Sequence, residues 1–147
     1  MQFKGTVQIA APRDTVWAFL MDPNQMGACG PGVESIEVVD ADHFKAKAKV
    51  GVGFMSARFA VAMTVAERAE PDRAVFKAHG QASGSAVDAT ADMRLSGPDD
   101  GPTTMDWSAD VHLAGTLASV GARLIEGTAN KMIGQTFDCV RAKLEAR

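Results

Sequence analysis

The sequence carries few of the side chains that catalysis requires, and their spacing keeps them apart. Its three histidines are His43, His79 and His112, and the pattern around them indicates that all three face solvent. Carboxylates such as Asp106 and Asp110 lie four positions apart on a predicted strand, which separates them by about 13 Å. That separation is too long for shared acid–base chemistry, so we predict no catalytic residues.

The cysteines and the glycine-rich segment also lack the spacing of chemical motifs. Cys29 and Cys139 form neither a CxxC pair nor a cysteine–histidine cluster, a pattern that we interpret as excluding structural zinc and a disulfide framework. We expect both thiols to pack as small hydrophobic groups. Gly51-Val52-Gly53 lacks the third glycine of a dinucleotide-binding loop and the lysine of a phosphate-binding loop. The sequence therefore predicts neither a metal site nor a cofactor.

Alternating apolar and polar residues predict a sheet along most of the chain. Residues 2–9 have the period of two that is expected of a strand with one wet face, and residues 105–113 show it most clearly. From residue 33 to residue 113 the apolar parity changes at successive turns. This segment therefore predicts five or six strands in hairpin succession.

Helical patterns flank this run of strands. Residues 12–20 predict a short helix, and residues 24–32 contain too many glycines and prolines for more than one further helical turn. Apolar residues recur with a period of about 3.6 over residues 117–144, which predicts a single long C-terminal helix. The fold class is therefore α+β, with a curved antiparallel sheet of about seven strands wrapped around this helix, in one domain spanning residues 1–147.

Composition and charge exclude several classes of function. The 147 residues are 46% hydrophobic and 22% charged, which is typical of one soluble globular domain. The net charge is only −3 and the basic residues are scattered, so we expect no nucleic-acid partner. No stretch approaches the ~18 consecutive apolar residues of a membrane span, and the first residues do not resemble a signal peptide. We therefore expect a cytoplasmic protein.

Small residues dominate the predicted inner face of the sheet. They are Ala46, Ala48, Ala78, Gly80, Ala89, Ala91 and Ala109. Such a face either lets the helix pack tightly onto the sheet or leaves a cavity between the two. Gly121, Gly127 and Gly134 weaken the long helix, which indicates a need for room or for close approach.

Several short motifs occur in an order and spacing that resemble those of one family. They are Phe3-Lys4-Gly5, Ala11-Pro12 before Val16-Trp17, Asp22-Pro23 before Cys29 and Pro31-Gly32, Val50-Gly51-Val52-Gly53, and Trp107-Ser108-Ala109-Asp110-Val111 before Gly115. The chain resembles, over almost its whole length, the carbon monoxide dehydrogenase G-subunit family of the helix-grip, or START-like, superfamily (SRPBCC). The resemblance implies an accessory protein without catalytic residues. Its expected partner is a molybdenum hydroxylase of the carbon monoxide dehydrogenase type, which it would link to the membrane and its quinone pool.

With this resemblance, a cavity is favoured over tight packing. A cavity of this kind suits a lipid-like molecule with a long hydrocarbon tail, such as an isoprenoid quinone. We expect it to be lined by the larger residues that share the inward parity of the strands or the apolar stripe of the helix. They are Phe59, Met63, Phe76, Met93, Trp107, Leu117, Val120, Leu124 and Met132.

The mouth of this cavity is expected near the N-terminal end of the long helix. There we expect a corner, Pro31-Gly32-Val33, to meet the hairpin tip Gly53-Phe54-Met55. Two large apolar residues in a turn indicate a lid, a partner contact or shallow insertion into lipid, and hence a peripheral contact at the inner face of the cell membrane. The alternative is that Phe54 folds back and plugs the end of the core.

Two other functions stay open. One is an enzyme of the aromatase or cyclase type, because such enzymes also use helix-grip cavities. The other is an assembly factor that binds no ligand. An enzyme needs inward-pointing His, Asp or Tyr side chains, whereas the predicted inner face offers almost none and the chain has no tyrosine. The favoured prediction is a non-enzymatic binding and adaptor protein.

Overall fold

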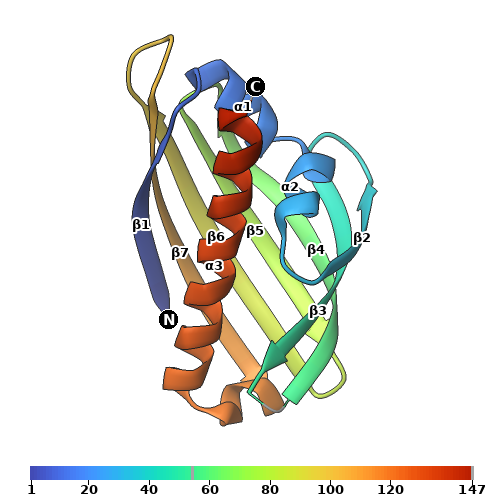
Figure 1. The fold of residues 1–147 in the computed structure, drawn as a ribbon. Coiled ribbons are helices and arrows are strands. Elements are labelled where there is room, and N and C mark those ends of the chain that lie inside the picture. Colours follow the sequence, from blue (N-terminus) through green and yellow to red (C-terminus); the bar gives the residue numbers. More distant parts are fainter. Residues whose placement is uncertain (54, 147) are drawn as a thin grey trace.

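A seven-stranded antiparallel sheet dominates a computed structural model, which describes residues 1–53 and 55–146 (Figure 1). The strand order is β1-β7-β6-β5-β4-β3-β2, so each strand pairs with its neighbour in sequence except β1, which pairs with β7. This confirms the expected helix-grip architecture. The strands are β1 (Gln2–Ile9), β2 (Val33–Val38), β3 (His43–Val52), β4 (Met55–Ala69), β5 (Arg73–Ala82), β6 (Ser85–Ser96) and β7 (Thr103–Gly115).

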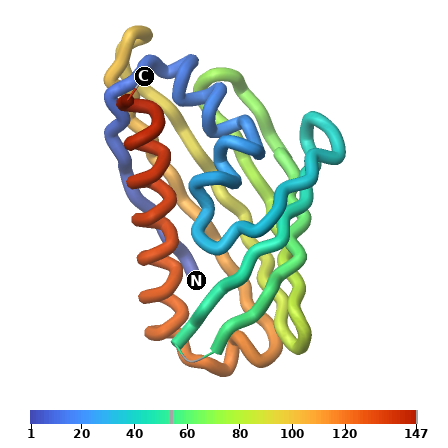
Figure 2. The backbone as a smooth tube through the Cα atoms, turned by 45° about the vertical axis from the view of Figure 1, so that its right-hand side comes forward, coloured from blue at the N-terminus to red at the C-terminus, as the bar shows by residue number. Residues whose placement is uncertain are grey.

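Three α-helices lie on one face of the sheet, here called the inner face. The longest, α3 (Ala122–Glu145), runs along the strands, while α1 (Arg13–Leu20) and α2 (Pro23–Cys29) lie beside its C-terminal half (Figures 1 and 2). The expected single helix from residue 117 is divided, because a 3₁₀ turn, η1 (Thr116–Val120), precedes α3. Gly121 separates the two helices with a φ of 111°, a conformation that glycine adopts without steric cost.

The segment after α1 forms a longer helix than the sequence predicts. The Asp22 carboxylate accepts hydrogen bonds from the backbone N–H groups of Asn24 and Gln25, and the Gln25 side chain, which also donates to it, holds the pKa of Asp22 below its ordinary value. Packing against β2 requires a glycine at position 27 of α2, since a Cβ there would lie 2.6 Å from Cγ1 of Ile36. The glycine that seemed to break the helix instead lets β2 approach it.

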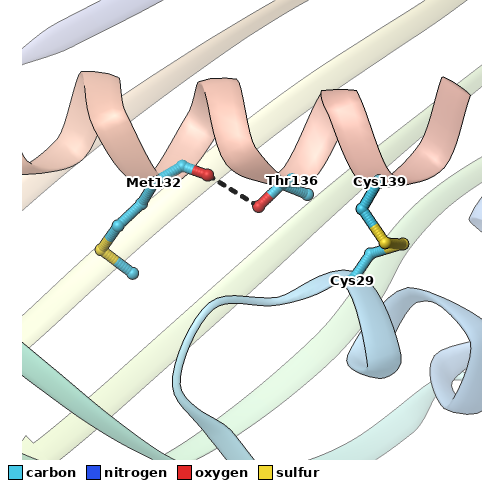
Figure 3. The surroundings of a disulfide bond; sticks show 4 residues. All are labelled: Cys29, Met132, Thr136 and Cys139. Carbon is cyan, nitrogen blue, oxygen red and sulfur yellow. Dashed lines mark hydrogen bonds between the residues drawn. A yellow bond between two sulfur atoms is a disulfide. The ribbon is translucent and has the colours of Figure 1, made fainter. Parts of the chain in front are cut away.

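The two cysteines form a disulfide, which corrects the expectation of unpaired thiols. Cys29 at the end of α2 is bonded to Cys139 on α3, with their Cα atoms 5.4 Å apart (Figure 3). Sequence spacing shows only whether cysteines are neighbours in the chain, and this pair is separated by 110 positions. Closing so long a loop stabilises the fold by about 4 to 5 kcal/mol in the chain-entropy account.

Two separate hydrophobic cores hold the sheet and helices together. The large core gathers α1, the C-terminal half of α3 and the adjoining strand ends, and Ile9, Phe19 and Val140 in it are almost fully buried. The small core lies at the opposite end of the sheet, where Phe59 of β4 and Leu117 of η1 are buried. The middle of the inner face belongs to neither core.

Candidate functional site: a hollow between the two cores

Four alanines form the middle of the inner face. Ala78 on β5 pairs with Ala89 on β6, and Ala91 on β6 pairs with Ala109 on β7. Residues two positions apart on a strand share a face, so these four methyl groups lie side by side. We call them the alanine floor.

Larger inward-pointing side chains around the alanine floor remain within reach of water. Met63 and Phe76 flank the floor, and both are partly exposed, as is Met132 on the facing side of α3. At the two ends of the same inner face, Phe59 and Met93 are each only 6% exposed. The inner face is therefore well covered at both ends and less completely covered in the middle. We call this partly exposed region over the alanine floor the hollow.

The side chains of α3 that face the hollow offer mainly apolar groups. Met132 projects from the same side of α3 as Cys139, over the strands and toward the loop that follows α2 (Figure 3). The Thr136 hydroxyl donates to the Met132 carbonyl at 2.8 Å, so it is satisfied within its own helix. Ile133 beside them is partly exposed. These side chains suit an apolar molecule.

The three histidines lie away from the inner face of the sheet. His79 pairs with Asp88 at 2.6 Å and His112 with Asp110 at 3.1 Å, and both histidine side chains are well exposed. His43 is likewise exposed, and its hydrogen bond to Asp40 (2.8 Å) holds the pKa of that carboxyl below its ordinary value. The prediction that the three histidines face solvent is therefore confirmed.

Two depressions on the outer face differ from the hollow in chemistry. One, of about 540 Å³, lies over β1, β7 and β6 beside Asp92 and Arg94. The other, of about 280 Å³, lies beside the His79–Asp88 pair. Both are open to solvent and lined by charged groups that already pair with one another, so neither suits an apolar ligand.

The nine residues predicted to line a cavity lie in different surroundings. Met63 and Met132 belong to neither core and flank the hollow, and Leu124 at the start of α3 is 42% exposed. The other six pack in or against a core. Those in the large core are Phe76, Met93 and Trp107, and those in the small core are Phe59, Leu117 and Val120.

The residues predicted for the mouth lie at two levels of the molecule. Gly53 at the hairpin tip lies against the start of α3, because a Cβ there would be 3.0 Å from Cδ2 of Leu124. Gly32 lies against the backbone of Lys49 on β3. Lys49 precedes Gly53 by four residues, or about 13 Å along an extended chain, so the structure does not bring Gly32 to the tip. Phe54 lies outside the described residues. Pro31 and Val33 adjoin Gly32 in the corner, where Val33 pairs with Ala48 of β3. Met55, at the tip, lines a cavity of about 10 Å³ at the small core.

Sequence reasoning missed two parts of this site. Val111 pairs with Ala89 and is partly exposed, so it also borders the alanine floor, and Ile133 is partly exposed beside Met132 on α3. Both carry the inward pattern of their elements, and that pattern was the signal available. The Cys29–Cys139 bond, which ties α2 to α3 beside the hollow, left no such signal.

The antiparallel sheet and the long helix along its inner face define a START-like helix-grip fold. A conserved protein from Geobacillus kaustophilus has a TM-score of 0.92 at 21% identity, over 99% of this chain and 96% of its own. An aromatase/cyclase, ZhuI, from Streptomyces sp. R1128 has a TM-score of 0.74 at 17% identity, over 100% and 94% of the chains. A START superfamily protein from Mycobacterium smegmatis has a TM-score of 0.70 at 15% identity, over 99% and 97%.

The sequence places the chain in a particular family of this class. The family model for the G subunit of carbon monoxide dehydrogenase (CoxG) matches residues 5–145, and the chain belongs to that family. A comparison with curated protein sequences gives no significant match. In the part of the chain that the structure describes, no helix combines the length and apolar character needed to span a membrane.

Proposed function

We propose that this chain is a non-enzymatic binding protein whose hollow holds a lipid-like molecule, in particular an isoprenoid quinone. The observation that carries the proposal is the partial exposure of inward-pointing Met63 and Met132, which belong to neither core, around a floor of alanine. Large apolar side chains on the concave side of a fold are normally buried. Their exposure at one level, between two closed cores, supports a binding site for an apolar guest.

The size of the hydrophobic effect supports useful affinity without polar contacts. Burying about 400 Å² of hydrocarbon tail at about 25 cal/mol per Å² gives about 10 kcal/mol. The loss of translational and conformational freedom on binding reduces this to an affinity in the micromolar range or somewhat better. A site of this kind can therefore both load and release its guest.

The family supports a place for the protein beside a redox enzyme. Because the chain belongs to the CoxG family, we propose that it carries its guest between an enzyme of the carbon monoxide dehydrogenase type and the membrane, with peripheral contact only. The exposed Leu124 beside the hairpin tip is the proposed membrane contact. Copurification with such an enzyme and flotation with vesicles test the two partners separately.

An aromatase or cyclase activity is the second candidate, favoured by the similarity to the Streptomyces aromatase/cyclase. Such chemistry needs acids or bases that reach the substrate. The alanine floor and the larger side chains that flank it are apolar, and the three histidines pair with aspartates on the outer face. This arrangement supports binding over turnover, and conversion of a bound polyketide chain by the purified protein would reverse that preference.

The proposal is tested by filling the hollow. Replacing both Ala89 and Ala91 with leucine adds bulk over the alanine floor, so we expect affinity for 2-decyl-1,4-benzoquinone, measured by calorimetry, to fall at least about tenfold. The matched control replaces Ala60 and Ala62, which also lie two positions apart on a strand but are exposed on the outer face. The control should bind the quinone as the unchanged protein does. Equal affinity in all three proteins would refute the hollow as the binding site.

The same quinone tests the proposed membrane contact. Leu124→Ser removes an exposed apolar side chain, so the free energy of unfolding and the quinone affinity should stay nearly unchanged. Transfer of bound quinone to vesicles, followed by stopped-flow absorbance, should become slower. Unchanged transfer would remove Leu124 from the release route and leave the binding site itself unaffected.

A further inference from the structure

The two tryptophans differ in how their indole N–H groups are satisfied. Trp17 Nε1 donates to Glu70 Oε1 at 2.8 Å. Trp107 Nε1 is shielded from solvent and has no hydrogen-bond partner among the described residues. A buried donor without an acceptor costs free energy that a phenylalanine or leucine at the same position would avoid.

The residue that carries this unpaired donor lies next to the alanine floor. Trp107 precedes Ala109 of the alanine floor by two positions on β7, so the two share a face, and it pairs with Met93 on one side. On the other side its indole lies over Gly5, where a Cβ would be 3.0 Å from Nε1. The ring centroids of Trp107 and of Phe137 on α3 are 5.5 Å apart. The indole is therefore held among apolar neighbours, with its ring partly exposed and its N–H covered.

We propose that the Trp107 N–H is the polar anchor of the hollow and that the bound molecule carries a neutral carbonyl oxygen at the end that reaches this indole. The inference rests on the proposed function, because it assigns the chemistry of the head of a guest whose apolar body lies over the alanine floor. On binding, a small rotation of the indole turns the N–H toward the carbonyl. The guest then satisfies a donor that the protein leaves unpaired.

The surroundings select the class of acceptor. An indole N–H donates and never accepts, so the partner atom must be an acceptor. Met93, Phe137 and Gly5 offer no cation to neutralise a carboxylate or phosphate, and an unpaired buried anion is disfavoured. A ketone or quinone carbonyl accepts one hydrogen bond without bringing a charge. A fatty acid in its ionised form should therefore bind more weakly than a quinone of similar tail length.

A matched pair of probes tests the anchor. 2-Decyl-1,4-benzoquinone and decylbenzene share a six-membered ring and a ten-carbon tail but differ in the two carbonyl groups. We expect Trp107→Phe to weaken quinone binding about tenfold, equivalent to about 1.4 kcal/mol, and to change decylbenzene binding less than about twofold. Trp17→Phe is the control for the loss of an indole whose N–H already has a partner, and it should affect neither probe selectively. Equal weakening of both probes by Trp107→Phe would reduce Trp107 to an apolar wall and overturn the proposal.

A second measurement needs no change at Trp107. In nitrogen-15 spectra of the unchanged protein, the two indole N–H signals are assigned by the loss of one in Trp17→Phe. Quinone should move the Trp107 signal downfield, as expected for a new hydrogen bond, whereas decylbenzene should not. A quinone that binds without moving this signal would overturn the anchor and leave the hollow in place. If neither probe binds, the proposed function fails, and the anchor fails with it.

Discussion

Ala78, Ala89, Ala91 and Ala109 matter because their side chains are small. All four lie on the inner face, and at both ends of that face larger residues pack into the two cores. The sheet gains less from packing at this level, because an alanine makes fewer dispersion contacts and buries less apolar area than a larger side chain. At the residue scale, the site is therefore defined by small side chains and by one unpaired indole.

The charged residues of the outer face contribute differently. Asp92 accepts two hydrogen bonds from the Arg73 guanidinium, at 2.8 and 3.3 Å, and Arg94 lies 3.5 Å away. The hydrogen bond from Arg73 is the main reason that the pKa of Asp92 is lowered in the folded protein. This pair stabilises the fold only while the carboxyl is ionised.

Acid titration should reveal this contribution. Because the folded pKa of Asp92 is lowered, its stabilising effect is fully present above the ordinary aspartate pKa of about 3.9 and is lost as pH falls through the lower folded value. Asp92→Asn should therefore be less stable than the unchanged protein at pH 7, and the difference should shrink below about pH 4. Urea unfolding at a series of pH values measures it. Parallel curves for the two proteins would show that Arg73 does not act through the charge of Asp92.

At the scale of elements, apolar parity predicts the strands well because each strand has one wet and one covered face. The hairpins fall where the parity changes, and β3 ends at Val52 before β4 begins at Met55, as expected. Helix boundaries were harder to predict. The end of η1 depends on the backbone of Gly121, and the length of α2 depends on Ile36 packing against Gly27, a contact between residues distant in sequence.

The glycines inside α3 do not mark a close contact, although the sequence allowed for one. A Cβ at Gly127 or Gly134 would meet no atom within 4 Å, so neither position serves a close approach. Both lie on the exposed side of the helix. They leave α3 with a weaker backbone along the hollow than alanine would give.

Filling these positions should therefore stabilise the protein. Gly127→Ala together with Gly134→Ala should raise the free energy of unfolding by about 1 to 2 kcal/mol, measured by urea denaturation. Gly121→Ala is the matched control, because its positive φ makes any side chain unfavourable there, and it should lower stability. A loss of stability in the double variant would show that α3 needs the flexibility of these glycines in its folded state.

At the scale of the whole molecule, the sequence predicted a sheet, a helix and a small-residue inner face, and the hollow lies where these meet. It did not predict that the hollow is bounded by two closed cores. That division depends on α1 and α2 covering one end and η1 covering the other. The position of a short helix over a sheet is decided by long-range packing, such as the burial of Phe19 and Leu117, which local periodicity does not encode.

The Cys29–Cys139 bond also changes the connectivity of the chain. Strands β2 to β7 all lie between the two cysteines, so the bond closes them into one covalent ring, with β1 and α1 attached outside it. A single cut in the exposed loop between β6 and β7, for example at Asp99, opens this ring without releasing a fragment.

Limited proteolysis should expose this topology. The protein nicked in that loop should migrate as one covalent species in denaturing gels without reductant and as two fragments with it. A variant with Cys29→Ala and Cys139→Ala should give two fragments under both conditions. Two fragments from the unchanged protein without reductant would show that the ring is open in solution. Where the ring is closed, a nicked molecule keeps all seven strands on one covalent framework and can refold as one unit.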